Sequence, residues 1–157
     1  MAELEVFKIV GPKYSADLTS GVAAAQLQRD TRVAASQAGT LEMAIDDNAN
    51  SEWSEGTAAT AAGAWFAIEF GTAVEIRRVT VQTGSGNNAC VNIDVEYYDG
   101  SAWVVAQNIR PGADNAVHAF AVAASSSHTQ WRLVCKVTIG APYSWTIREV
   151  EMMEIVR

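Results

Sequence analysis

The sequence predicts an all-β protein, a sandwich or barrel of antiparallel strands in one domain. In its C-terminal half, short runs of alternating apolar and polar residues are separated by turn residues. The chain has 157 residues, which is long enough to bury a core without the support of disulfides or zinc. Its composition, 49% apolar and 18% charged, is that of a folded protein and not of a disordered or membrane-spanning one.

The clearest strand covers residues 91–98, where strict alternation leaves one face apolar and the other wet. Asp99-Gly100 follows at once and is a strong hairpin signal, so we expect residues 103–105 to form the returning strand. Residues 130–137 alternate in the same way. Further strands are expected at residues 65–70, 74–83, 117–122 and 145–155.

Irregular segments interrupt this pattern. The apolar phase slips by one residue between Ile76 and Val79, where two arginines intervene. Either one arginine points inward or a β-bulge lies there, and we expect the bulge. Residues 54–63 and 84–89 are rich in small and polar residues and are predicted to be loops, where such a scaffold carries recognition.

The N-terminal residues differ in character, and we predict residues 1–32 to be an arm or docking extension outside a sandwich of residues 33–157. Residues 4–10 have the pattern of a strand, and residues 20–32 are rich in Ala and Gln with ambiguous helical tendency. Met1 is followed by alternating residues, without the basic start and unbroken apolar run of a secretory signal. We therefore expect no classical signal peptide.

Charge and cysteine content exclude some classes of partner. The net charge of -7 would repel a phosphate backbone, and the basic residues are scattered, so we expect no nucleic-acid partner. No apolar run is long enough to insert into a membrane. Cys90 and Cys135 have neither metal-ligand spacing nor a nearby catalytic partner, and we expect two buried thiols.

Residues 43–53 (MAIDDNANSEW) place short oxygen-bearing side chains in a tight turn between apolar anchors. Hard cations such as calcium are bound by carboxylate, amide, hydroxyl and carbonyl oxygens of this kind. An EF-hand competes, because Asp46, Asn48 and Asn50 fall at alternate positions. It fails because Ser51 replaces the required glycine and Thr57 stands where a bidentate Glu is needed.

That segment is followed, in order, by residues 65–71 (WFAIEFG), 95–103 (VEYYDGSAW), 131–133 (WRL) and 147–151 (IREVE). Together they resemble the coagulation-factor C-type, or discoidin, domain, a galactose-binding-like family that includes many carbohydrate-binding modules. The resemblance covers roughly residues 33–156. It implies a jelly-roll β-sandwich of about eight antiparallel strands, here with an N-terminal arm.

The resemblance also implies a structural calcium site that joins the early turn to the last strand. By position, Asp46, Asn48 and Ser51 would supply side-chain oxygens and Glu149 a carboxylate. Met43 and Arg148 would supply backbone carbonyls. Asp47 stands where the family usually has glycine, and Asp tolerates the left-handed backbone needed there. The alternative is a hydrogen-bonded Asx turn without metal.

In sugar-binding relatives the ligand lies on loops at one end of the sandwich, where an aromatic ring stacks on the sugar and polar groups bind its hydroxyls. Relatives often carry an arginine and then an asparagine after the strand that here ends at Thr83. This chain has the asparagine and lacks the arginine. The ligand-binding candidates are Asn87, Asn88, Tyr143 and Trp145, with core packing as the alternative for Trp145. Trp53, Trp65 and Trp103 occupy family core positions and are expected to pack.

Evidence for catalysis is thin, because His118 and His128 are the only histidines and adjacent Ser and His residues do not make a triad. We predict a non-enzymatic binding or adhesion module that recognises a glycan of a cell surface or matrix. The alternative is a structural assembly protein of a phage particle, such as a capsid decoration, fibre or tail component. Its arm would then dock onto virion neighbours or form a homo-oligomer. Either function places the protein on a virion or an extracellular surface.

Overall fold

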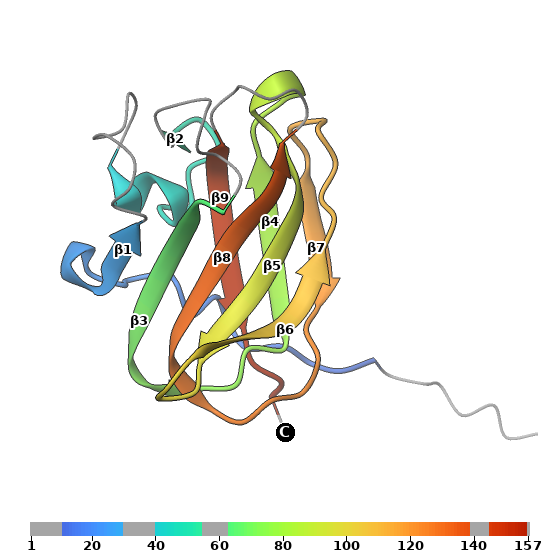
Figure 1. Cartoon of the computed structure of the whole chain (residues 1–157). Helices are drawn as coiled ribbons and strands as arrows, with labels where there is room; N and C mark the ends of the chain where they lie inside the picture. The colour runs from blue at the N-terminus through green and yellow to red at the C-terminus, as the bar shows by residue number, and fades with distance from the viewer. Residues whose placement is uncertain (1–10, 30–39, 55–62, 139–144, 157) are drawn as a thin grey trace, which may run out of the picture.

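Two antiparallel β-sheets pack face to face in the computed structural model, which describes residues 11–29, 40–54, 63–138 and 145–156 (Figure 1). One sheet has the strand order β1-β3-β8-β5-β6 and the other the order β2-β9-β4-β7. The all-β sandwich prediction is therefore confirmed. The strands are β1 (Leu27–Arg29), β2 (Trp53–Ser54), β3 (Trp65–Val74), β4 (Arg78–Thr83), β5 (Cys90–Tyr98), β6 (Trp103–Ile109), β7 (Val117–Ala121), β8 (His128–Thr138) and β9 (Thr146–Met153).

The core lies between the two sheets and is filled by the inward-facing residue of each alternating pair. Trp53 is buried there as expected, in edge contact with Trp145 at 5.7 Å between ring centroids. Trp65 and Trp103 are only partly buried and are not part of this core, so their expected core positions were wrong. They are half-buried on the outer face of the five-stranded sheet, because their positions alternate with the inward residues of β3 and β6.

The hairpin predicted at Asp99-Gly100 joins β5 to β6. Gly100 has a φ of 102°, a value that favours glycine. One carboxylate oxygen of Asp99 accepts hydrogen bonds from the backbone N–H groups of Ser101 and Ala102, each at 2.8 Å. These bonds lower the pKa of Asp99 below its ordinary value.

The bulge predicted between Ile76 and Val79 is not present. Residues 75–77 instead link β3 in one sheet to β4 in the other, and the phase of the pattern changes because the chain changes sheets. Ile76 remains completely buried, and the Arg77 N–H bonds to the Met153 carbonyl at 2.8 Å. An irregularity in register does occur in β3, between Glu69 and Val74.

The described part of the predicted arm, residues 11–29, lies against the sandwich and does not stand apart from it. Leu18 N–H bonds to the Met152 carbonyl at 2.9 Å, which places this stretch beside β9. β1 then pairs with β3 of the other sheet. The free backbone groups at the edges of β9 and β3 explain this placement, because they need hydrogen-bond partners. The domain boundary at residue 32 remains a prediction, and residues 4–10 lie outside the described residues.

Helical structure is limited to three 3-10 segments, η1 (Ala24–Gln26), η2 (Leu41–Ala44) and η3 (Gly86–Asn88), in the residues that the structure describes. The ambiguous stretch at residues 20–32 contains η1 and β1. Over the same described ranges, no helix is long and apolar enough to cross a membrane.

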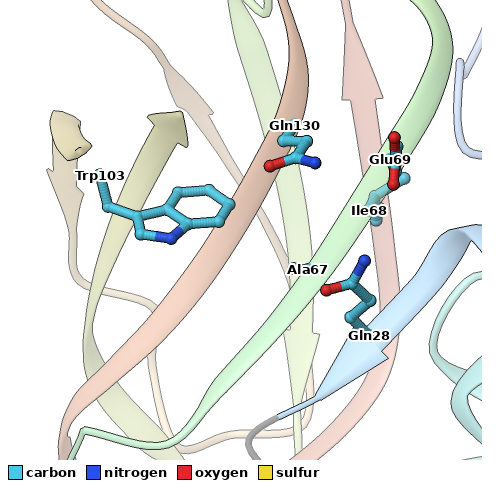
Figure 2. Close-up of a pocket in the computed structure, with 6 residues that line it drawn as sticks. All are labelled: Gln28, Ala67, Ile68, Glu69, Trp103 and Gln130. Carbon is cyan, nitrogen blue, oxygen red and sulfur yellow. The ribbon is translucent and has the colours of Figure 1, made fainter. Parts of the chain in front are cut away.

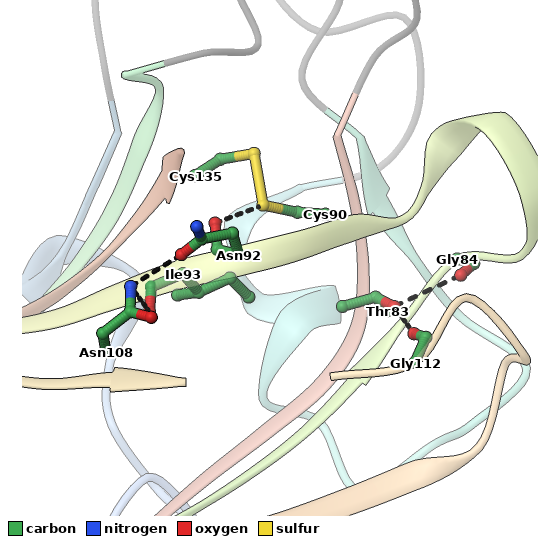
Figure 3. The surroundings of a disulfide bond; sticks show 8 residues. All are labelled: Thr83, Gly84, Cys90, Asn92, Ile93, Asn108, Gly112 and Cys135. Carbon is green, nitrogen blue, oxygen red and sulfur yellow. Dashed lines mark hydrogen bonds between the residues drawn. A yellow bond between two sulfur atoms is a disulfide. The ribbon is translucent and has the colours of Figure 1, made fainter. Parts of the chain in front are cut away.

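Cys90 and Cys135 form a disulfide between β5 and β8, so the expectation of two buried thiols was wrong in its chemistry though correct in burial (Figure 3). Strand pairing explains the bond, because it brings their Cα atoms to 6.0 Å although 45 positions separate them in sequence. Asn108 of β6 donates to the side-chain oxygens of Asn92 at 2.6 Å and Asp94 at 2.7 Å beside the disulfide.

Candidate functional site

The turn after η2 brings together the side chains of Asp46 and Ser51 and the backbone of Asn48, whose side-chain oxygen accepts the Asn50 N–H at 3.1 Å. The Ser51 hydroxyl lies 2.8 Å from each carboxylate oxygen of Asp46, and the Asn48 N–H donates to Asp46 Oδ1 at 3.0 Å. Asp47 has a φ of 57°, as the glycine-like position predicts. The turn thus has the hydrogen bonds of an Asx turn and also gathers oxygen atoms of the kind that hard cations prefer.

Glu149 of β9 faces this turn from the last strand. Its Oε1 atom accepts the Val150 N–H at 3.1 Å, while Oε2 is buried with no hydrogen-bond partner in the described structure. The pKa of Glu149 is raised to about 7, mainly by burial and also by the negative charges of Asp47, Asp46 and Asp17, while the hydrogen bond from the Val150 N–H acts in the opposite direction. The site therefore holds more negative charge than its hydrogen bonds compensate.

Arg148 contributes through its side chain as well as its position on β9. Its guanidinium donates to the Ala49 carbonyl at 3.1 Å and forms an ion pair with Glu52 at 3.0 Å. Both contacts tie the turn to the last strand. Met43 lies in η2, just before the turn, and its N–H bonds to the Thr40 carbonyl at 3.1 Å. The sequence had indicated only the carbonyl groups of these two residues.

The predicted calcium ligands are mostly neutral oxygens, with two carboxylates, from Asp46 and Glu149. Within the described ranges, no group of three or more His, Cys, Asp or Glu side chains is placed to hold a metal ion. A transition-metal site of histidines and thiolates is therefore not formed by these residues. The unpartnered Glu149 oxygen and the all-oxygen set do fit a hard cation.

A second polar cluster lies at the end of the sandwich where the chain leaves β4, at the coil near the top of Figure 1. His118 of β7 contacts Asp114 at 2.8 Å between Nε2 and Oδ1, and the two side chains are 30% and 58% exposed. The His118 hydrogen bond and the Ala116 N–H lower the pKa of Asp114. Asp114 therefore remains a charged acceptor that faces solvent.

The loop that contains η3 lies against this pair. Ser85 and Asp114 form an isolated antiparallel bridge, and the Gly86 N–H bonds to the Ala113 carbonyl at 3.3 Å. Thr83 donates to the Gly112 carbonyl at 3.2 Å, and Figure 3 shows the two residues side by side. We call the residues 84–89 and 112–118 the loop end. The sequence indicated His118 only as a possible partner of a nucleophile, and it gave no signal for Asp114.

The predicted ligand residues have different outcomes. Asn88 is exposed in η3 at the loop end. Trp145 is completely buried against Trp53, which confirms the core alternative and leaves no ring face for a sugar. The side chain of Asn87 and the whole of Tyr143 lie outside the described residues.

Neither histidine belongs to a Ser–His–Asp arrangement in the described structure. His128 Nε2 lies 3.0 Å from the Ser126 hydroxyl, but no carboxylate bonds to its ring among the described residues, and the ring stacks on Tyr97 at 4.0 Å. His118 has a carboxylate partner, Asp114, and no described hydroxyl or thiol bonds to its ring. The hydroxyl partner is thus found at His128 and the carboxylate partner at His118, so in the described part of the chain neither histidine has both partners that a catalytic triad requires.

Known proteins resemble this chain in structure but do not match it in sequence. No family profile matches the sequence, and no curated protein matches it. Solved structures of carbohydrate-binding modules match it over most of its length. The family 32 module of Clostridium perfringens NanJ, solved in complex with galactose, has a TM-score of 0.67 at 14% identity and covers 85% of this chain and 97% of its own.

Two further solved carbohydrate-binding modules match the chain to a similar degree. A chitosan-binding module from a chitosanase/glucanase of Paenibacillus sp. IK-5 has a TM-score of 0.68 at 14% identity, covering 88% of this chain and 98% of its own. The family 32 module of AlyQ, in complex with 4,5-unsaturated mannuronic acid, has a TM-score of 0.63 at 17% identity, covering 80% and 92%. The chain therefore has the galactose-binding-like, discoidin-type fold.

Proposed function

We propose that this chain is a carbohydrate-binding module without a catalytic role, and that the loop end holds its ligand. The observation that carries the proposal is the match of the whole sandwich to modules solved with bound saccharides. The loop end adds the required chemistry, since the exposed Asp114 and Asn88 and the half-buried His118 offer donors and acceptors for hydroxyl groups. We expect a glycan of a cell surface or matrix as the partner.

The side chains at the loop end narrow the class of glycan. Asp114 keeps its charge because its pKa is lowered, so it accepts hydrogen bonds and repels acidic sugars. The arginine of the sugar-binding relatives is absent after Thr83. We therefore propose a neutral glycan and do not assign galactose in particular.

A glycan array tests this proposal with the purified chain and the variant Asp114→Asn. The expected result is binding to neutral glycans, weakened about tenfold by the variant, because a hydrogen bond to a charged group contributes about 1.5–3 kcal/mol. Ser101→Ala, at the exposed β5–β6 hairpin, is the matched control and should bind as the unmodified chain does. Unchanged binding by Asp114→Asn would place the ligand elsewhere.

We further propose that calcium binds at the turn and Glu149 and closes the sandwich. The support is the oxygen-only set of Asp46, Asn48 and Ser51, together with the partnerless Glu149 oxygen. Carbonyl groups of Met43 and Arg148 would complete the coordination. A bound cation would neutralise the carboxylates and link the early turn to β9.

Thermal unfolding of chelated protein measures this effect directly. Millimolar calcium should raise the melting temperature, and Asp46→Ala should abolish the increase. Asp99→Asn is the comparison, because Asp99 bonds to the Ser101 and Ala102 N–H groups in the β5–β6 hairpin and is not a proposed ligand. Identical melting curves with and without calcium would exclude the calcium site and support an Asx turn without metal.

We also propose that the protein works in an oxidising, extracellular setting, for which the Cys90–Cys135 disulfide is the support. The phage assembly function remains an alternative, with virion neighbours or a homo-oligomer as partners. Sedimentation of the full chain and of a chain lacking residues 1–10 tests it. A single monomeric species in both, with glycan binding retained, would count against assembly.

A further inference from the structure

A small hollow lies on the outer face of the five-stranded sheet, and none of the residues that line it belongs to the loop end (Figure 2). Its floor is formed at Ala67 and Ile68 of β3, and its border consists of Gln28 of β1, Glu69 of β3, Gln130 of β8 and Trp103 of β6. The strand register explains the grouping, because Gln28 pairs with Ala67 and Glu69 pairs with Gln130. The small Ala67 side chain leaves the space that larger neighbours border.

Trp103 is held in a fixed position at this hollow. The Arg132 guanidinium carbon lies 4.2 Å from the centre of the Trp103 ring, and Arg132 is in turn held by an ion pair with Glu96 at 2.6 Å. The Tyr98 ring lies 5.4 Å from the Trp103 ring. These contacts restrict the ring before any ligand arrives, which lowers the entropy lost on binding.

The polar side chains around the hollow have no partners within the molecule as described. Gln28, Glu69 and Gln130 make no side-chain hydrogen bond or ion pair with any described residue, although the Glu69 carbonyl accepts one from Gln26. Two amides and one carboxylate therefore remain available beside an aromatic ring. Among the residues that border the hollow, Glu69 carries the one formal charge, so an anionic ligand would be repelled.

The backbone at the hollow also excludes one class of ligand. β3 is already paired with β1 on one side and β8 on the other, so a peptide cannot join the sheet there as an added strand. What remains is recognition by side chains, from an aromatic ring and from amide and carboxylate groups. A sugar ring offers the matching surfaces, since its C–H face packs on an aromatic ring and its hydroxyls bond to amides and carboxylates.

We propose that the surface around this hollow is a second saccharide site, where a neutral hexose unit of an oligosaccharide lies across the Trp103 ring. The hollow itself, with a volume of about 10 Å³, has room for one hydroxyl group of that sugar. Trp103 would pack against the sugar ring, while Gln28 and Gln130 would bond to its hydroxyls and Glu69 would accept from them. The site is distinct from the loop end and does not depend on it. Two sites on one small domain would let a single chain engage two glycan segments and gain avidity.

An array of neutral oligosaccharides separates the two sites when the loop end is disabled by Asp114→Ala and His118→Ala together. We expect this variant still to bind some neutral oligosaccharides. The further changes Gln28→Ala and Gln130→Ala should weaken the remaining binding about tenfold, because two hydrogen bonds are lost. Thr129→Ala, an exposed neighbour on β8, is the control. Loss of all binding in the loop-end variant, or no effect of the glutamine changes, would overturn the second site.

Fluorine NMR of protein labelled with 5-fluorotryptophan locates the sugar. The chain has five tryptophans, and Trp103→Phe identifies the Trp103 resonance. Adding the retained oligosaccharide should shift this resonance and leave those of the fully buried Trp53 and Trp131 in place. A Trp103 resonance that stays unchanged at saturating sugar would contradict the proposal.

Discussion

Arg132 and Glu96 form an ion pair at 2.6 Å on the outer face of the five-stranded sheet, partly covered by the Trp103 ring. The side chains are only 18% and 9% exposed, so each charge depends on the other for compensation. Arg132→Ala would leave the Glu96 carboxylate buried and unpaired, and we expect it to lower the free energy of unfolding by about 3–5 kcal/mol. Urea denaturation measures this change.

Lys136→Ala provides the comparison on the same strand. Lys136 is 48% exposed, and its partner Asp94 also accepts a hydrogen bond from Asn108 at 2.7 Å. We expect a loss of less than about 1 kcal/mol, as for other exposed pairs. Equal losses for the two variants would mean that the Arg132–Glu96 pair behaves as an ordinary surface pair.

The calcium-free protein should lose stability as pH rises. The pKa of Glu149 is about 7 in the folded chain against an ordinary value of 4.5, so the folded state binds its proton more tightly than the unfolded state. The contribution of Glu149 to the free energy of unfolding is therefore greatest below about pH 4.5, and it is lost as the pH rises to about 7. Because the group is partly exposed, we expect an effect on the order of 1 kcal/mol.

Glu149→Gln should remove this pH dependence, and Glu151→Gln on the same strand should not. Thermal unfolding in chelator between pH 4 and pH 8 compares the three proteins. If calcium binds as proposed, its stabilising effect should grow with pH over the same interval and be lost in Glu149→Gln. If the melting temperature of Glu149→Gln depends on pH as that of the unmodified chain does, then Glu149 is not the cause of the pH dependence.

Removing the disulfide should destabilise the fold substantially. With 45 positions between Cys90 and Cys135, the chain-entropy relation predicts a loss of about 4 kcal/mol for Cys90→Ala with Cys135→Ala. Denaturation with and without a reductant supplies the control, since reduction should weaken the unmodified chain and leave the double variant unchanged. A reductant effect of equal size in both proteins would refute this assignment.

Gly112→Ala should disturb the loop end and spare the sandwich. An added Cβ would lie 3.0 Å from His118 Nε2 and 3.1 Å from each carboxylate oxygen of Asp114, so these side chains must shift by a few tenths of an ångström and their hydrogen bond is disturbed. We expect weaker glycan binding, a pKa of Asp114 that rises toward its ordinary value, and little change in melting temperature. NMR titration measures the pKa, and Gly71→Ala, where an added Cβ meets nothing within 4 Å, is the control.

Local signals made most of the strands predictable from sequence. The hairpin at Asp99-Gly100 depends on neighbouring residues alone, and so does the left-handed backbone at Asp47. The cluster of Asp46, Asn48 and Ser51 also forms within one turn. In each case the contacts join residues a few positions apart.

Features that depend on distant parts of the chain were missed. The disulfide arises only when β5 pairs with β8, and the outer placement of Trp65 and Trp103 depends on which face each sheet buries. The His118–Asp114 contact joins residues only four positions apart, but its place at a binding surface depends on the Ser85–Asp114 bridge, which joins this turn to the distant η3 loop. A sequence pattern specifies the period of a strand, but the partner across the sheet is a property of the complete fold.

Residues 11–29 protect the molecule against association with itself. An unpaired strand edge is a template for other chains, and this segment covers β9 with the Leu18 N–H bond and β3 with the pairing of β1. A chain cut at residue 33 would expose both edges at once. Such a fragment should be prone to aggregate, although it would retain every core residue from Ala44 to Met152.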